Sequence, residues 1–129
     1  MRTALISAAA VGSGGFLGAL ARYGLSGLVQ RYAPLATFPY GTLAVNLLGC
    51  IAIGVVGGLA ESRHVLGPEA RAFVIIGVLG GFTTFSTLGY DTFGMLRNSD
   101  YLRAVINVGL HVILGLTFVW LGYTVAASR

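Results

Sequence analysis

The stretch GGFTTFST (residues 80–87) lies at the centre of the third apolar segment of the chain. Adjacent glycines followed by hydroxyl residues and phenylalanines are poor material for a continuous helix, and we predict that the helix breaks here, at the glycine pair. If the segment crosses a membrane, irregular backbone is tolerated only where it lines a cavity or is buried in protein. Freed carbonyls at such a break can coordinate cations, and hydroxyls can meet anions. The stretch therefore predicts either an ion site or a kink that only packs.

The distribution of charge around this stretch predicts a membrane protein. Of the 129 residues, 56% are hydrophobic and only 9% are charged, whereas a soluble domain carries about 25% charge. This composition excludes a soluble enzyme or nucleic-acid-binding module. Charge-free runs cover residues 3–21, 32–60, 72–90 and 104–128, and each is close to or longer than the roughly 20 residues that span a bilayer. We expect one all-α domain over residues 1–129, with transmembrane helices over about 4–29, 41–60, 71–96 and 102–126.

The arginines predict how the chain sits in the membrane. They are scattered singly and form no patch, so we expect no nucleic-acid partner. Short loops make neighbouring helices antiparallel, and the arginines then divide almost equally between the two sides. One side holds Arg2, Arg63, Arg71 and Arg129, and the other holds Arg31, Arg97 and Arg103, with Arg22 near the end of the first helix. An excess of positive charge on one side fixes orientation. The near balance predicts insertion in both orientations and a natural antiparallel dimer.

Small residues recur every four positions in the first two segments. Ala10, Gly14 and Gly18 form one stripe, and Cys50, Gly54 and Gly58 continue from Asn46 in the other. Small residues let membrane helices approach closely, so we predict that both stripes are packing faces.

The polar residues within the segments favour an anion over a cation. Arg103, Asn107, His111 and Gly115 follow one another at intervals of four, on one face of the fourth segment. Asn46 brings an amide into the second segment, where a single Asn most often joins helices. These amides and the hydroxyls of residues 83–87 are hydrogen-bond donors, and no fixed negative charge accompanies them. The chain lacks a P-loop, a dinucleotide fingerprint and a Ser–His–acid set, so we do not expect an enzyme.

GGFTTFST, together with Asn46 in GTLAVNL (residues 41–47) and Arg22 in the first helix, resembles the Fluc/CrcB family of fluoride-specific ion channels. The resemblance covers essentially the whole chain. It implies an antiparallel, dual-topology homodimer in the lipid of the cell inner membrane, with two pores that passively export fluoride from the cytoplasm. It also implies a sodium ion at the dimer centre, which is structural and not transported.

The resemblance assigns roles by position. The sodium ion would be bound by the backbone carbonyls of Gly80 and Thr83. The fluoride pore would include Asn46, Phe85, Ser86, Thr87, Leu88, Asn107, His111 and Gly115, with Arg22, Thr84 and Asp91 in the pore region or in structural roles. Three positions depart from the family pattern: Leu88 replaces a second pore phenylalanine, Gly115 replaces a serine, and Asp91 replaces a glutamate.

Two other functions fit four short membrane helices. A small multidrug or guanidinium exporter would need a carboxylate inside the membrane early in the chain, and the one candidate, Asp91, lies near the end of the third segment. A non-transporting anchor subunit of a complex would pass no ions.

Overall fold

The structure, a computed structural model, describes residues 2–63 and 66–128, and all regular structure in these residues is helical. Four helical stretches are long and apolar enough to cross a membrane, as predicted from the charge-free runs: Thr3–Arg31, Tyr40–Glu61, Pro68–Arg97 and Tyr101–Ala127. The elements in chain order are α1 (Arg2–Arg31), α2 (Tyr40–Arg63), α3 (Pro68–Arg71), the π-helix η1 (Ala72–Leu79), α4 (Gly80–Phe82), α5 (Phe85–Arg97) and α6 (Tyr101–Ala127).

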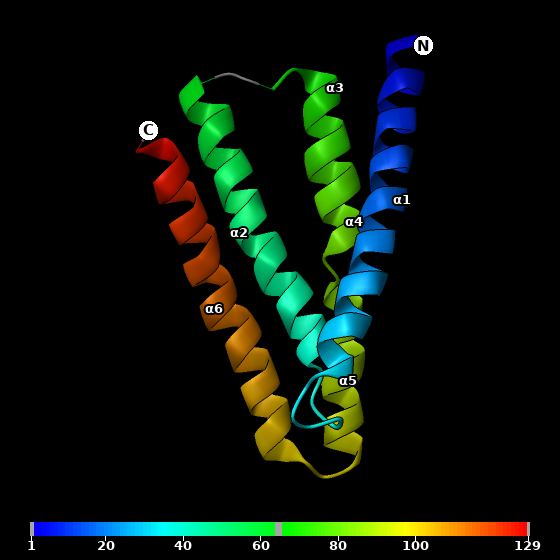
Figure 1. Cartoon of the computed structure of the whole chain (residues 1–129), viewed down its shortest axis with the longest axis vertical. Coiled ribbons are helices and arrows are strands. Elements are labelled where there is room, and N and C mark those ends of the chain that lie inside the picture. Colours follow the sequence, from blue (N-terminus) through cyan, green and yellow to red (C-terminus); the bar gives the residue numbers. More distant parts are fainter. Residues whose placement is uncertain (1, 64–65, 129) are drawn as a thin grey trace.

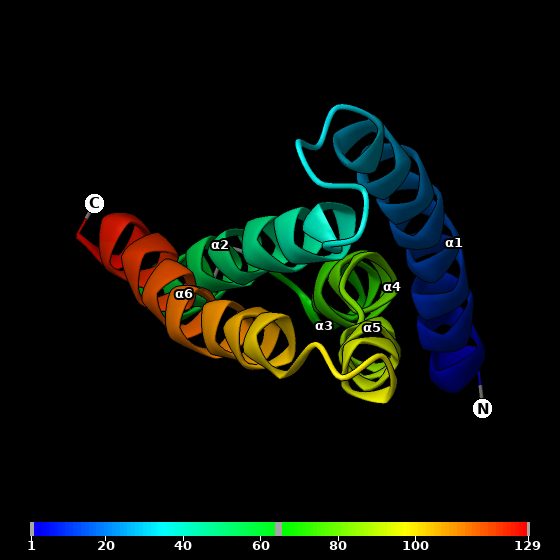
Figure 2. The same cartoon turned by 90° about the horizontal axis from the view of Figure 1, so that it is seen from below.

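The helices form two packed pairs (Figure 1). One pair is α2 with α6, and in the other α1 lies along η1 and α4. The start of α1 and the end of α6 lie at the same end of the bundle as the end of α2 and the start of α3. The loop between α1 and α2 and the turn between α5 and α6 lie at the opposite end. Seen along the bundle, α4 and α5 lie between α1 on one side and α2 with α6 on the other (Figure 2).

Glycines make both pairs close, as the stripes predict. A Cβ atom on Gly14 or Gly18 would clash with backbone atoms of Phe73 or Val78 in η1. In the other pair, a Cβ atom on Gly54 would clash with the backbone of Val119 in α6. Because water provides no hydrophobic driving force inside a bilayer, such backbone contact is a principal source of helix association there.

The third span changes conformation four times along its length. It begins as the short helix α3, continues as the π-helix η1, and returns to α-helix at α4. Thr83 (φ −84°, ψ 158°) and Thr84 (φ −152°, ψ 114°) are extended, and α5 then begins at Phe85.

This arrangement corrects the position that the sequence favours for the interruption. Gly80 and Gly81 are helical, and the extended residues are the two threonines that follow them. Threonine is β-branched and tolerates extended backbone well. Gly81 instead serves packing, because a Cβ atom there would lie 2.6 Å from the carbonyl oxygen of Gly15.

A single side chain organises the loop between α1 and α2. The amide Nε2 of Gln30 donates hydrogen bonds to the carbonyl oxygens of Ala36 (3.3 Å) and Phe38 (3.0 Å). Its Oε1 accepts from the backbone N–H of Gly41 at 3.1 Å, at the start of α2. Phe38 is buried and packs with Met95 and Ala104, so the loop is fixed to both α5 and α6.

Candidate ion pathway

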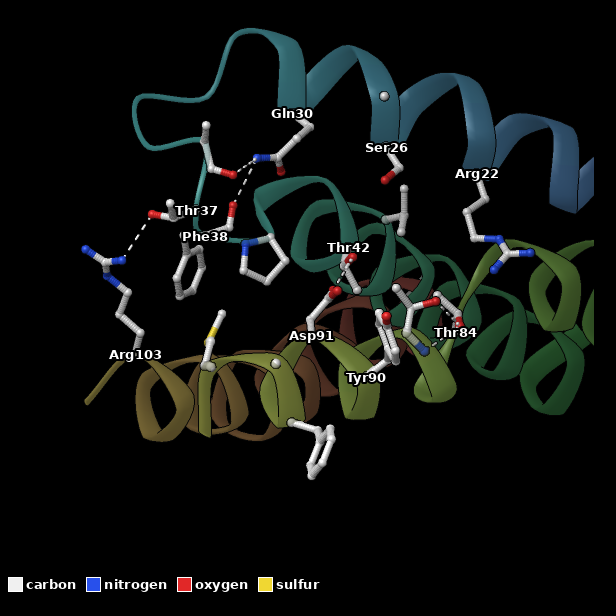
Figure 3. A pocket seen from close by; sticks show the side chains of 18 of the residues that line it. Arg22, Ser26, Gln30, Thr37, Phe38, Thr42, Thr84, Tyr90, Asp91 and Arg103 are labelled. Atoms are coloured by element: carbon white, nitrogen blue, oxygen red, sulfur yellow. Dashed lines mark hydrogen bonds between the residues drawn. The ribbon is translucent and has the colours of Figure 1, made fainter. Parts of the chain in front are cut away.

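A cavity of about 1030 Å³ opens at the loop end of the bundle, between α1, α2, α5 and the first loop. Five charged residues line it: Arg22, Asp91, Arg97, Asp100 and Arg103. Figure 3 shows Arg22 and Asp91 pointing into the cavity, from α1 and α5 respectively. Hydroxyl and amide groups, including those of Ser26, Gln30 and Thr42, complete a lining that suits a hydrated ion.

In the described part of the chain, three of the five charged side chains of the cavity have partners, whereas Arg22 and Arg97 have none. The Thr42 hydroxyl donates to the Asp91 carboxylate at 3.0 Å. Arg103 forms an ion pair with Asp100 at 3.1 Å and donates to the Thr37 hydroxyl at 3.0 Å. Among the described residues, nothing forms a hydrogen bond or ion pair with the Arg22 guanidinium. Its positive charge is therefore free to act on an anion that enters the cavity.

A second hollow, a groove of about 510 Å³, lies between α2, α6 and the third span. Asn46, Thr83 and Thr84 supply its polar groups near the third span, and His111 supplies one from α6. No Asp, Glu, Lys or Arg is present among the described residues that line it, and its ionisable groups are Cys50 and His111. The groove thus offers short-range polar contacts and no fixed charge.

Thr84 lines both the cavity and the groove. Its backbone is held by Asn46, whose Oδ1 accepts from the Thr84 N–H at 2.8 Å and whose Nδ2 donates to the Thr84 carbonyl at 3.1 Å. Its hydroxyl caps α5 by accepting from the Thr87 N–H at 3.3 Å. The two hollows therefore meet at a residue whose extended conformation is fixed by an asparagine of a neighbouring helix.

The same contacts leave two backbone carbonyls without their usual helical donors. In a continuous α-helix, the N–H of Thr84 would bond the carbonyl of Gly80, and the N–H of Thr87 would bond that of Thr83. Here the Thr84 N–H donates to Asn46 instead, and the Thr87 N–H donates to the Thr84 hydroxyl. Gly80 and Thr83 both line the groove, and backbone carbonyl oxygens are ligands of the kind that hard cations prefer. In the part of the chain that is described, no cluster of three His, Cys, Asp or Glu side chains offers another metal site.

Comparison with known protein families shows to which family the chain belongs. The model of a family described as "CrcB-like protein, Camphor Resistance (CrcB)" matches residues 9–123. This chain belongs to the CrcB family.

Curated relatives agree with the family assignment, and each carries the name "Fluoride-specific ion channel FluC". The protein of Nitratidesulfovibrio vulgaris (strain DSM 19637 / Miyazaki F) is 46% identical over 112 residues, which cover 87% of this chain and 90% of the relative. That of Opitutus terrae is 47% identical over 118 residues, covering 89% and 88%. That of Geotalea daltonii is 44% identical over 119 residues, covering 92% and 94%.

The structure brings together most of the residues that the CrcB resemblance singles out. The groove is lined by Asn46, Gly80, Thr83, Thr84, Phe85, Leu88, His111 and Gly115. The cavity is lined by Arg22, Thr84, Thr87 and Asp91. Ser86 and Asn107 line neither hollow: Ser86 is exposed and Asn107 is fully buried.

Several polar residues near the pathway were not predicted from the CrcB motifs. Thr42 binds Asp91, and Thr92 links α5 to α6 by accepting from the Asn107 amide at 3.0 Å. Gln30 and Thr37 fix the loop beside the cavity. The available signal was the presence of hydroxyl and amide side chains within or beside apolar spans, where such groups need partners.

Proposed function

We propose that this chain forms a channel through which fluoride crosses a cell membrane passively, by way of the cavity, Thr84 and the groove. The observation that carries the proposal is the meeting of the charged cavity and the uncharged groove at Thr84, in a chain of the CrcB family. The fluoride-channel names of the relatives support the choice of ion. Four transmembrane-length helices place the chain in a membrane as a multi-pass protein, and the inner membrane of a bacterium is the location we infer.

The groups near Thr84 provide donors suited to a small, strongly hydrated anion. An Asn amide has two N–H donors, and Asn46 uses one of them on the Thr84 carbonyl, which leaves the second for the groove. The hydroxyls of Thr84, Ser86 and Thr87 make two mutual contacts, at 3.2 and 3.0 Å. Each such contact uses one proton, so one of the three hydroxyl protons remains for an ion. Phe85 can add the positive edge of its ring.

We further propose that a structural sodium ion is held by the carbonyls of Gly80 and Thr83. The diversion of their usual helical donors supports this assignment. Such an ion would supply positive potential beside the groove. The interruption at Thr83 and Thr84 would then lie at mid-membrane, where irregular backbone is tolerated because it lines a cavity.

The assembly that we propose is an antiparallel homodimer with two pores. Large apolar side chains that line the groove are exposed; they include Phe85 (84%), Val112 (52%) and Leu116 (70%). A second copy is the natural cover for this face, and the near balance of arginines between the two ends allows that copy to insert the other way up. Accessibility of a tag at one terminus from both sides of the membrane tests this, and labelling from one side alone would contradict dual topology.

Fluoride efflux from proteoliposomes, followed with a fluoride electrode, tests the function directly. We expect rapid efflux that persists when chloride is present in excess. Absence of ion flux from the purified protein would favour a non-transporting membrane anchor. Proton-coupled movement of a cationic dye would favour a small multidrug exporter.

A further inference from the structure

His111 and Asn107 form an unusual buried polar pair beside the groove. Asn107 is 0% exposed, and in the described part of the chain nothing bonds its Oδ1 atom or the Nε2 atom of His111, although both atoms are buried. Buried polar atoms are nearly always paired, so two orphans on adjacent turns of one helix call for a physical explanation.

The surrounding hydrogen bonds determine whether Asn107 Oδ1 and His111 Nε2 are donors or acceptors. The Thr92 hydroxyl donates its single proton to the Leu88 carbonyl at 2.7 Å, so its oxygen can only accept from Asn107. The Asn107 amide must therefore present Nδ2 to Thr92, which leaves Oδ1 as a bare acceptor. His111 Nδ1 lies 2.9 Å from the Asn107 carbonyl oxygen, which also only accepts, so Nδ1 carries a proton.

It follows that neutral His111 presents a bare acceptor at Nε2. A neutral imidazole has one N–H and one lone pair, and the N–H is already used. The lone pairs of Nε2 and of Asn107 Oδ1 are then both buried without a donor, on successive turns of α6. Their electrostatic effect on an anion in the adjoining groove is unfavourable. Protonation of the ring replaces one lone pair by a donor and adds a positive charge.

Among the described residues that line the groove, no titrating charge masks this change, and the proposed sodium ion at Gly80 and Thr83 would add a positive potential that does not vary with pH. Of the elements packed around the groove, α2 contributes the Cys50 thiol and η1, α4 and α5 contribute no ionisable lining residue. The charged residues Arg22, Asp91, Arg97, Asp100 and Arg103 line the separate cavity at the loop end. The protonated ring would be the one formal positive charge among the described residues that line the groove.

We propose that the charge on His111 controls anion occupancy of the adjoining groove: the neutral ring, with its buried lone pair, opposes an anion, and the protonated ring attracts one across the short distance to the groove. The inference rests on the proposed function, because it takes fluoride as the anion. Thermodynamic linkage requires the effect to be reciprocal: acid strengthens fluoride binding, and fluoride promotes protonation of His111.

The first test is the pH profile of fluoride efflux. We measure efflux from proteoliposomes at about pH 8 and about pH 5.5, on either side of the ordinary imidazole range, and subtract the leak of protein-free liposomes at each pH. For the unaltered protein, efflux at low fluoride should rise by about fivefold or more on acidification, a typical size for coupling between two sites. His111→Gln and His111→Asn keep a neutral polar side chain and should respond by less than about twofold. His64→Gln, which removes the other histidine of the chain, is the matched control and should keep the full response.

A second readout does not depend on transport. In the His64→Gln background the chain holds one histidine, so ¹⁵N-histidine spectra in micelles report His111 alone. At neutral pH the spectrum should show the tautomer protonated at Nδ1. At a fixed pH near 6.5, replacing gluconate by fluoride should raise the protonated fraction of His111.

The outcomes separate the two proposals. Efflux with the same pH profile in the unaltered protein and in His111→Gln would overturn the role of His111 and leave the channel function intact. A protonated fraction of His111 that does not change when fluoride is added would have the same meaning. Absence of efflux from the unaltered protein at every pH would overturn the proposed function and the inference that rests on it.

Discussion

The cavity and the groove meet at Thr84 but are lined by different kinds of residue. The cavity gathers arginines and aspartates around an open space of about 1030 Å³, whereas the groove of about 510 Å³ is lined by residues without formal charge. Charges act over distances of about 10 Å at moderate salt, and hydrogen bonds act only at contact. The cavity is therefore suited to collecting ions from water, and the groove is suited to discriminating between them.

The largest effect is expected where the two regions are joined. Asn46→Ala removes both hydrogen bonds that hold the Thr84 backbone and leaves its N–H and carbonyl without these partners. At about 1–3 kcal/mol for each unsatisfied group, we expect a loss of about 2–6 kcal/mol in the free energy of unfolding, with loss of fluoride efflux. Unfolding in mixed micelles and electrode assays measure the two quantities. Unchanged stability would show that Asn46 does not hold the junction.

The second largest effect on fluoride efflux is expected from a substitution within the groove. Phe85 is 84% exposed in the single chain and isoleucine is also a large apolar residue, so Phe85→Ile should leave folding and assembly intact while it abolishes fluoride efflux. The reason is that the ring edge, which can face an anion, has no aliphatic equivalent. Phe16→Ile is the matched control, because Phe16 is 65% exposed on α1 and lines neither hollow. Normal flux in Phe85→Ile would remove this residue from the pathway.

A smaller effect on stability should come from the helix just before the junction. A Cβ atom at Gly81 would lie 2.6 Å from the Gly15 carbonyl oxygen, so Gly81→Ala must displace α1 or α4. Overpacking of this kind costs about 1–3 kcal/mol of unfolding free energy. Gly24→Ala, on α1 with no atom within 4 Å of the added Cβ, should cost nothing comparable. Equal stability of the two variants would mean that α1 and α4 do not pack as described.

The smallest effect is expected in the cavity, and salt should reduce it. Arg22→Gln removes a cavity charge that has no partner among the described residues. An interaction of about 1 kcal/mol with a passing anion corresponds to about a fivefold reduction in efflux at low ionic strength. The difference should shrink as salt is added, because screening shortens the range of the charge. Arg31→Gln, at an exposed position that lines neither hollow, should have little effect; equal losses in both variants would argue against a specific role for Arg22.

The features that could be predicted from the sequence are those that depend on local composition. The charge-free runs identify the four membrane-length helices because lipid tolerates few charges. The spacing of Gly14, Gly18 and Gly54 identifies packing faces because residues four apart share one side of a helix.

The features that were missed depend on contacts between distant residues. The interruption lies at Thr83 and Thr84 rather than at the glycine pair because Asn46, on another helix, binds the backbone there. Local propensity cannot reveal such a contact. The π-helix η1 was likewise not predicted, and we find no physical signal for it in the residues 72–79. The role of Thr92 in orienting Asn107 becomes visible only when α5 and α6 are placed side by side.

The Gln30 clamp has a consequence for how entry to the cavity is controlled. Three hydrogen bonds from one neutral amide, together with the buried Phe38, hold the bordering loop against α2, α5 and α6. An amide does not titrate, so acid or base leaves this attachment unchanged. The loop therefore keeps this attachment from acid to alkaline conditions, and any effect of pH on ion passage must originate at another part of the molecule.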